Sequence, residues 1–145
     1  MSATTPADQE FFDQYAKSRS VLDIDVIASQ YPDSLMFAGP NGARLTEKTA
    51  ILAAIPKGQE LLKALGHKST KVLSLDEIKL DDHYVLVRAQ FAWRFEKSSA
   101  QPIDVRLNST FILYVSQGAP KIVFQHEHED FQQALRASSV LTANP

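Results

Sequence analysis

The sequence predicts an α+β domain in which a few helices pack on one face of a curved antiparallel sheet. Apolar residues follow a helical period up to about residue 66 and alternate as in strands from about residue 68. The chain has 145 residues, of which 44% are hydrophobic, and these values are typical of one globular domain. We therefore expect a single domain over residues 1–145.

Two helices are predicted at the start of the chain. Thr5-Pro6-Ala7-Asp8 combines a hydroxyl cap, a proline at the first helical position and a carboxylate in the first turn. The apolar stripe that follows consists of Phe11, Phe12, Tyr15 and Ala16. Asp23 precedes a second, shorter helical pattern, and Pro32 ends it because proline cannot continue a helix.

A short strand, a turn and a third helix come next. Leu35-Met36-Phe37 is predicted as the strand. Pro40-Asn41-Gly42 is predicted as the turn, since Asn-Gly tolerates positive φ. Thr46 is predicted to cap the helix, and we expect Pro56 and Gly58 to interrupt it.

The second half of the chain is predicted to form an antiparallel meander. The strand candidates span about residues 69–79, 83–96, 104–116 and 120–129. The polar or Gly/Pro-containing segments between them are typical of hairpin connections. A last short helix is indicated by Phe131, Ala134 and Leu135.

Both faces of this sheet carry apolar residues. One face of the longest strand holds Val85, Val87, Ala89, Phe91, Trp93 and Phe95. The opposite face of the next strand still carries Ile112 and Tyr114, although a sheet with one wet face alternates more cleanly. Because the few helices can cover only one face, we expect a second copy of the chain to cover the other, giving a homodimer. The alternative is a monomer whose connections curl over that face.

Composition excludes several classes of function. The chain has no cysteine, which excludes a disulfide framework, a thiolate metal site and a cysteine nucleophile. Its formal net charge is −2 and it has no basic patch, so nucleic acid is not an expected partner. No apolar run approaches 18 residues, so no membrane association is expected. The acidic first residues do not resemble a signal peptide, and we expect a cytoplasmic protein without a cofactor.

Three stretches of the sequence carry a family resemblance. They are Phe37-Ala38-Gly39-Pro40-Asn41-Gly42 with Leu45-Thr46 and Ala50-Ile51-Leu52, Val85-Leu86-Val87-Arg88-Ala89, and Lys121-Ile122-Val123-Phe124-Gln125-His126-Glu127-His128. In their order and spacing, over about residues 6–131, the chain resembles the nuclear transport factor 2-like superfamily. The similarity is to its SnoaL-like and calcium/calmodulin-dependent kinase association-domain-like branch. The resemblance implies a cystatin-like cone, in which a bent sheet wraps on a long first helix and leaves a pocket in its mouth.

Members of this superfamily include ketosteroid isomerases, polyketide cyclases, dehydratases and non-catalytic assembly domains, so the fold does not fix the function. The resemblance matches Tyr15 to the tyrosine that binds the oxyanion in a ketosteroid isomerase. The matching base position falls near Ala38-Gly39-Pro40, which offers no carboxylate. The isomerase interpretation is therefore disfavoured. Tyr15 stays a pocket candidate, with a core aromatic whose hydroxyl is satisfied as the alternative.

The run His126-Glu127-His128 is the most polar stretch on any predicted strand. His126 and Glu127 are candidates for acid–base catalysis, since histidine titrates near neutrality, and His126 and His128 are candidate pocket residues. A metal site would need a third ligand from His67, His83 or Glu129, and we do not expect one. Histidines hydrogen-bonded at the rim of the sheet are the alternative.

The sequence leaves open which side of this strand faces the pocket. Simple alternation from Ile122 and Phe124 turns both histidines inward. Matching to the kinase association domain instead turns Gln125 and Glu127 inward. A single β-bulge would decide between the two.

Arg88 and Gln90 share one face of the longest strand, between Leu86 and Ala92. A buried arginine needs an anionic or carbonyl partner, so Arg88 and Gln90 are predicted to bind a small carboxylate or carbonyl ligand. The alternative is an ion pair between Arg88 and an acid across the sheet or the dimer interface.

Two functions follow from these residues. The first is a small-molecule-binding cone that is capable of proton transfer without a cofactor, as in isomerisation, cyclisation or dehydration. The second is a non-catalytic association module of the same fold.

Overall fold

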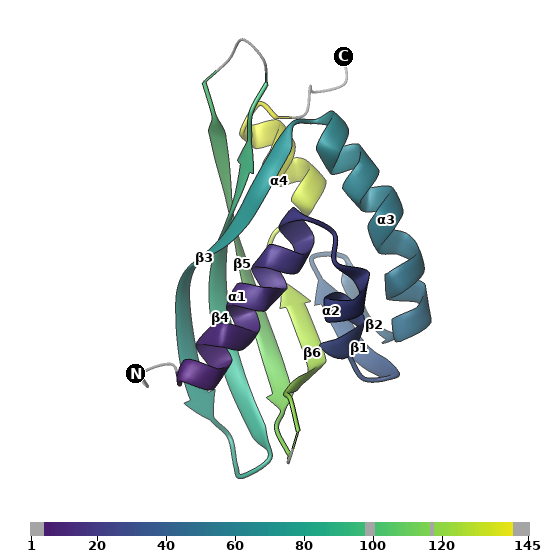
Figure 1. The fold of residues 1–145 in the computed structure, drawn as a ribbon, viewed down its shortest axis with the longest axis vertical. Helices are drawn as coiled ribbons and strands as arrows, with labels where there is room; N and C mark the ends of the chain where they lie inside the picture. Colours follow the sequence, from purple (N-terminus) through teal and green to yellow (C-terminus); the bar gives the residue numbers. More distant parts are fainter. Residues whose placement is uncertain (1–4, 98–100, 117, 141–145) are drawn as a thin grey trace.

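The computed structural model describes residues 5–97, 101–116 and 118–140. In these residues it has, in chain order, α1 (Pro6–Ser20), α2 (Ile24–Ser29), β1 (Ser34–Gly39), β2 (Gly42–Glu47), α3 (Lys48–Ala64), β3 (His67–Lys79), β4 (Tyr84–Phe95), β5 (Ile103–Tyr114), β6 (Lys121–Glu127) and α4 (Phe131–Ala137). The predicted α+β class is confirmed. Figure 1 shows α1 lying across the concave face of a curved sheet, with α3 standing off at one edge.

The two N-terminal helices begin where their capping residues predict. The hydroxyl of Thr5 accepts a hydrogen bond from the backbone N–H of Asp8 at 3.2 Å, and Pro6 occupies the first helical position. The carboxylate of Asp23 accepts from the N–H of Val26 at 3.2 Å. Both caps satisfy backbone donors that a helix start otherwise leaves without a partner.

The third helix differs from its prediction. It runs without a break from Lys48 to Ala64 with Pro56 inside it, and Thr46 lies in β2 instead of capping the helix. Proline in a helix interior costs about 3 kcal/mol. Apolar side chains on both sides of the proline pack on the core. Ile51 and Ile55 precede it and Leu62 follows it, and this packing keeps the segments before and after Pro56 in one helix.

The sheet has the strand order β2-β1-β6-β5-β4-β3. The meander from β3 to β6 is antiparallel as predicted, but β1 pairs with β6 in parallel, with Met36 opposite Phe124. The sheet is therefore mixed. The sequence does not indicate this pairing, because it joins segments that are far apart along the chain. Strand β2 was also not predicted, since its residues are mostly exposed and show no apolar alternation.

The main core lies between α1 and the concave face of the sheet. Phe12 of α1 packs on Phe111 of β5 at a ring distance of 4.9 Å, and Tyr15 stacks on Phe91 of β4 at 5.2 Å. A second apolar cluster lies around Phe95, where α4 meets β4 and β5. Between these two clusters the cone remains open.

A β-bulge in β6 decides which of its side chains face inward. Leu113 pairs with Ile122 and Ile112 pairs with Phe124, so the bulge lies at Val123. Ile122 and Gln125 are consequently both buried on the concave side. The alternative implied by the kinase association domain is therefore the one adopted.

None of the helices in the described ranges is long and apolar enough to cross a membrane.

Candidate functional site

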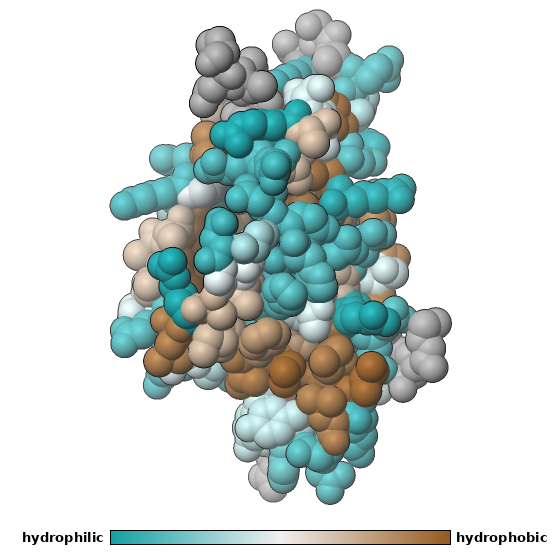
Figure 2. Space-filling view, turned by 180° about the vertical axis from the view of Figure 1, so that it is seen from behind, coloured by the Kyte–Doolittle hydropathy of each residue, from teal (hydrophilic) through white to brown (hydrophobic). Residues whose placement is uncertain are grey.

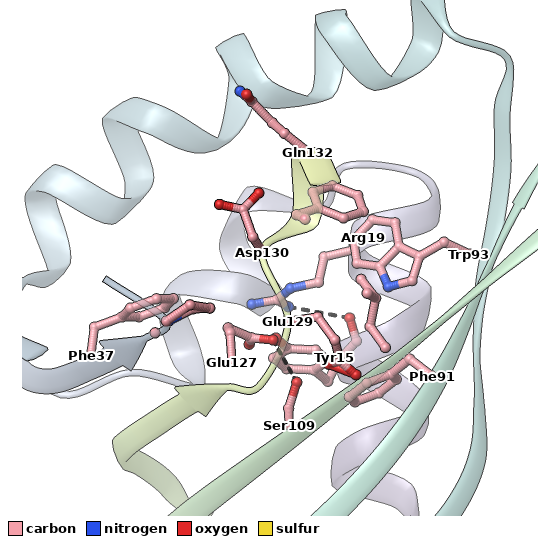
Figure 3. A pocket seen from close by; sticks show the side chains of 14 residues that line it. Tyr15, Arg19, Phe37, Phe91, Trp93, Ser109, Glu127, Glu129, Asp130 and Gln132 are labelled. Atoms are coloured by element: carbon pink, nitrogen blue, oxygen red, sulfur yellow. Dashed lines mark hydrogen bonds between the residues drawn. The ribbon is translucent and has the colours of Figure 1, made fainter. Parts of the chain in front are cut away.

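A cavity of about 600 Å³ lies in the mouth of the cone. Residues from α1, β1, β4, β5 and the segment from β6 to α4 surround it, and Figure 3 shows their side chains converging. Five aromatic residues and six other residues with polar or charged side chains line it. The lining residues are Tyr15, Arg19, Phe37, Gly39, Pro40, Phe91, Trp93, Leu107, Ser109, Glu127, Glu129, Asp130, Phe131 and Gln132.

The side-chain amide of Gln125 organises the floor of this cavity. Its oxygen accepts a hydrogen bond from the hydroxyl of Tyr31 at 2.7 Å. Its nitrogen donates to the hydroxyl of Tyr15 at 3.1 Å and to Oε1 of Glu127 at 2.6 Å. Because a carboxylate only accepts hydrogen bonds, the amide nitrogen must face Glu127, and the amide oxygen is left to accept from Tyr31.

Arg19 stands at the opposite end of this network from Glu127. Its Nη2 donates to the hydroxyl of Tyr31 at 2.9 Å, and its Nη1 donates to the carbonyl of Tyr15 and the hydroxyl of Ser18, both at 3.2 Å. The guanidinium carbon lies 3.5 Å from the centre of the Tyr15 ring, in a cation–π contact. A directed chain of donors therefore runs from Arg19 through Tyr31 and Gln125 to Glu127.

The two tyrosines in this chain remain neutral. Burial raises the pKa of Tyr15 well above its ordinary value of 10.0, and burial also raises that of Tyr31. The positive charge of Arg19 opposes both shifts without cancelling them. Tyr31 therefore keeps the proton that it donates to Gln125.

The carboxylate of Glu127 is half-buried and is the acceptor on which the network ends. Its Oε2 accepts from the hydroxyl of Ser109 at 2.6 Å, while Oε1 accepts from Gln125. Glu127 pairs with no cation among the residues that the structure describes. Each carboxylate oxygen has two acceptor positions, so Glu127 can accept further hydrogen bonds on the cavity side.

The other two carboxylates at the cavity, Glu129 and Asp130, accept hydrogen bonds from backbone N–H groups. Glu129 accepts from the backbone N–H of Asn108 at 3.0 Å and from its side-chain amide at 2.8 Å. Asp130 caps α4 by accepting from the N–H of Gln133 at 3.0 Å. Glu127 is thus the carboxylate held by side-chain donors alone.

A family model described as NTF2-like protein (DUF6841) matches residues 8–130. The chain belongs to this NTF2-like family. No curated protein matches it significantly.

Solved structures similar to this NTF2-like chain share its fold at low sequence identity. An NTF2-like protein with a cystatin-like fold from Novosphingobium aromaticivorans superposes with a TM-score of 0.71 at 13% identity, covering 94% of this chain and 88% of that one. The beta subunit of benzoate 1,2-dioxygenase from Burkholderia mallei gives 0.70 at 14% identity, covering 92% and 95%. A protein from Xanthomonas campestris, provisionally named as a calcium/calmodulin-dependent protein kinase II association domain, gives 0.65 at 15%, covering 88% and 93%.

The structure divides the predicted site residues of the NTF2-like chain between two faces of the sheet. Tyr15 and Glu127 line the cavity. The predicted residues on the outer, convex face are Arg88, Gln90, His126 and His128. Arg88, Gln90 and His128 together line a separate hollow of about 340 Å³ on that face, so the predicted residues are divided between two places.

The ion pair that Arg88 forms on the outer face matches the alternative named for this residue. Arg88 pairs with Asp76, its neighbour on β3, at 3.8 Å, and its side chain is 61% exposed. The amide of Gln90 donates to the side chain of Asn108 at 3.3 Å. Strict alternation along β4 causes this placement, because Val87, Ala89 and Phe91 occupy the inner positions.

The two histidines stack on each other outside the cone. The ring centres of His126 and His128 lie 4.2 Å apart, and Nε2 of His128 lies 2.8 Å from the hydroxyl of Thr110. Over the described part of the chain, no group of three histidine, aspartate or glutamate side chains could hold a metal ion.

Sequence reasoning missed four members of the network as site residues: Arg19, Tyr31, Ser109 and Gln125. Two of them carried a usable signal. Arg19 follows Tyr15 by one helical turn and so shares its face of α1. Ser109 is a polar residue at an inner position of β5, between Leu107 and Phe111. Tyr31 and Gln125 become part of the site only through the packing of α2 and the bulge in β6.

Proposed function

We propose that this NTF2-like chain binds a small organic molecule in the cavity and that Glu127 accepts a hydrogen bond or a proton from it. The observation that carries this proposal is a half-buried carboxylate held at 2.6 Å by two neutral donors, Ser109 and Gln125, with its remaining acceptor positions toward an aromatic cavity. Cavities of this kind, largely apolar with a few convergent polar groups, are typical of ligand sites.

The same arrangement supports proton transfer without a cofactor, of the isomerase, cyclase or dehydratase type. Ser109 and Gln125 each donate a hydrogen bond to the carboxylate of Glu127 and so orient it toward the cavity. A positioned carboxylate of this kind contributes about 10²–10⁴-fold to a reaction in which it accepts a proton. In this proposal Glu127 is the catalytic residue, while Ser109 and Gln125 are positioning residues.

Native mass spectrometry of the purified protein tests the binding proposal. We expect the wild type to carry a small molecule as a defined extra mass, and E127Q to lose it, because a neutral amide accepts a proton far less readily than a carboxylate. E129Q is the matched control, since Glu129 is directed to Asn108. If both variants kept the same extra mass, Glu127 would not be the binding group.

A second function, self-association through the outer face of the sheet, is supported by a separate observation. Residues paired in register form one apolar row across all the strands: Leu45, Met36, Phe124, Ile112, Leu86 and Ile78. Figure 2 shows apolar side chains gathered as a band across the lower part of this face, below a larger polar area. Leu45 is 70% exposed and Ile78 is 48% exposed, which is unfavourable for large apolar groups in water.

We propose that a second copy covers this row, giving a homodimer. Two of the similar structures are named for assembly, one as an association domain and one as a beta subunit. Light scattering after size exclusion measures the assembly directly. L86K places a charge in the apolar row and should give monomers, whereas Q90K adds the same charge to the polar part of the same strand and should leave the dimer intact. A monomeric wild type would contradict this proposal.

A further inference from the structure

A second cavity, of about 460 Å³, lies beneath α3. It shares Arg19, Phe37 and Trp93 with the cavity around Glu127, so the two cavities adjoin each other at these side chains. We call the part around Glu127 the head lobe and the part beneath α3 the tail lobe. The two lobes have different chemistry, and this difference restricts the molecule that can occupy both.

The tail lobe is apolar. The face of α3 that lines it presents Ala50, Ala54 and Gly58, which lie one helical turn apart, with Ile51 and Ile55 beside them. Gly58 is exposed, and a Cβ placed on it would meet no atom within 4 Å, so there is room for a larger side chain at this position. An aliphatic chain or ring occupying this lobe would remove its own surface and that of α3 from water.

The head lobe favours a donor over an anion. Its carboxylates are Glu127, Glu129 and Asp130, against a single guanidinium. Arg19 directs its terminal nitrogens toward Tyr31, Ser18 and the carbonyl of Tyr15, not toward Glu127. An anionic head group would therefore meet excess negative charge, whereas a hydroxyl or an ammonium would complete the acceptor positions of Glu127.

We propose that the ligand is amphipathic, with a hydrogen-bond-donating head that is not anionic at Glu127 and an apolar tail beneath α3. This inference rests on the proposed function, since it requires that the head lobe binds a ligand. The inference goes further in two ways. It names the chemical class of that ligand, and it extends the binding site to α3, which does not line the head lobe.

The chain contains a natural reporter for this test. Trp93 is its only tryptophan and lines both lobes, so its fluorescence responds to a molecule in either. The probes are straight-chain amines, alcohols and carboxylates with four to ten carbons, titrated at pH 7. Each added methylene should tighten binding by about fourfold until the tail lobe is filled. At equal length, the amine and the alcohol should bind at least about tenfold more tightly than the carboxylate.

A54F fills the tail lobe from the middle of α3 and should abolish the dependence on chain length while leaving the four-carbon amine unaffected. A53F is the matched control, because Ala53 is exposed like Ala54 but does not line either lobe. G58L fills the same lobe from a different position and repeats the test if A54F unfolds. Circular dichroism and light scattering on each variant establish that fold and assembly are unchanged.

The possible failures are distinguishable. If no probe changes the Trp93 signal, or if E127Q binds every probe like the wild type, the proposed function fails and this inference fails with it. If binding depends on Glu127 but not on chain length or on A54F, the proposed function stands and the amphipathic class is wrong. Tightest binding by the carboxylates, or a change of oligomeric state in A54F, would also overturn this inference.

Discussion

The concave and convex faces of the same sheet differ in burial and in the contacts of their side chains, although residues close together on one strand supply both. On β3, Asp76 points outward to Arg88, while Glu77 is buried beside the start of α1, where its carboxylate accepts from the backbone N–H of Thr5 at 2.9 Å. On β5, Phe111 is wholly buried and Tyr114 is 37% exposed. Where a strand has no bulge, the environment of a side chain is therefore set by its position in the in–out alternation of that strand. Residues from the two faces can be compared in pairs.

The largest difference is expected from aromatic residues on β5. F111A removes a ring that packs against Phe12 and Tyr15, and should lower the free energy of unfolding by about 3–5 kcal/mol. Y114A on the outer face should cost less than about 1.5 kcal/mol, because its ring is already partly in water. Chemical denaturation measures both. Equal losses would mean that the outer face is as well packed as the inner one.

A pH effect is expected next, from Glu77. Burial and the neighbouring Asp8 raise the pKa of Glu77 from 4.5 to about 7. The folded state thus holds a proton that the unfolded state has already lost, so stability falls as the pH rises from 4.5 to 7 and then levels off. Over this pH range the free energy of unfolding should fall by about 2–3 kcal/mol.

Denaturation at pH 5 and pH 8 measures this effect, and E77Q should remove most of it because the amide does not titrate. D76N on the outer face of the same strand is the control and should leave the pH dependence in place. Persistence of the full dependence in E77Q would assign it to another group.

A smaller difference is expected from one substitution made on each face. Q125L removes the amide that joins Tyr31, Tyr15 and Glu127. Because buried polar groups are then left without this partner, the free energy of unfolding should fall by about 1–3 kcal/mol. Q90L loses only a hydrogen bond of 3.3 Å at an exposed site and should change stability by less than about 0.5 kcal/mol. Thermal unfolding compares them. If Q125L were as stable as the wild type, the network would not hold Glu127 in place.

The smallest effect is expected from R88A. The ion pair with Asp76 spans 3.8 Å between side chains that are 61% and 39% exposed, so its loss should cost about 0–1 kcal/mol. R88A should also leave the Trp93 titrations unchanged, because Arg88 lies outside both lobes. A clear loss of binding in R88A would mean that Arg88 contributes to the ligand site, as the sequence predicts.

Local sequence patterns were sufficient to predict most of the helices and strands. The caps at Thr5 and Asp23 and the strand alternation in the second half of the chain are set by neighbours a few residues apart, and these elements form as predicted. The inner positions of β4 and the membership of Tyr15 in the core follow from the same short-range periodicity.

The tertiary structure decided the rest. The parallel pairing of β1 with β6 and the continuity of α3 through Pro56 depend on packing between distant segments. The site depends on one extra residue, Val123, whose bulge turns Gln125 and Glu127 inward and both neighbouring histidines outward. Because the side-chain period of a strand is two, a shift of one residue exchanges its faces, and no local preference in the sequence fixes where that shift occurs.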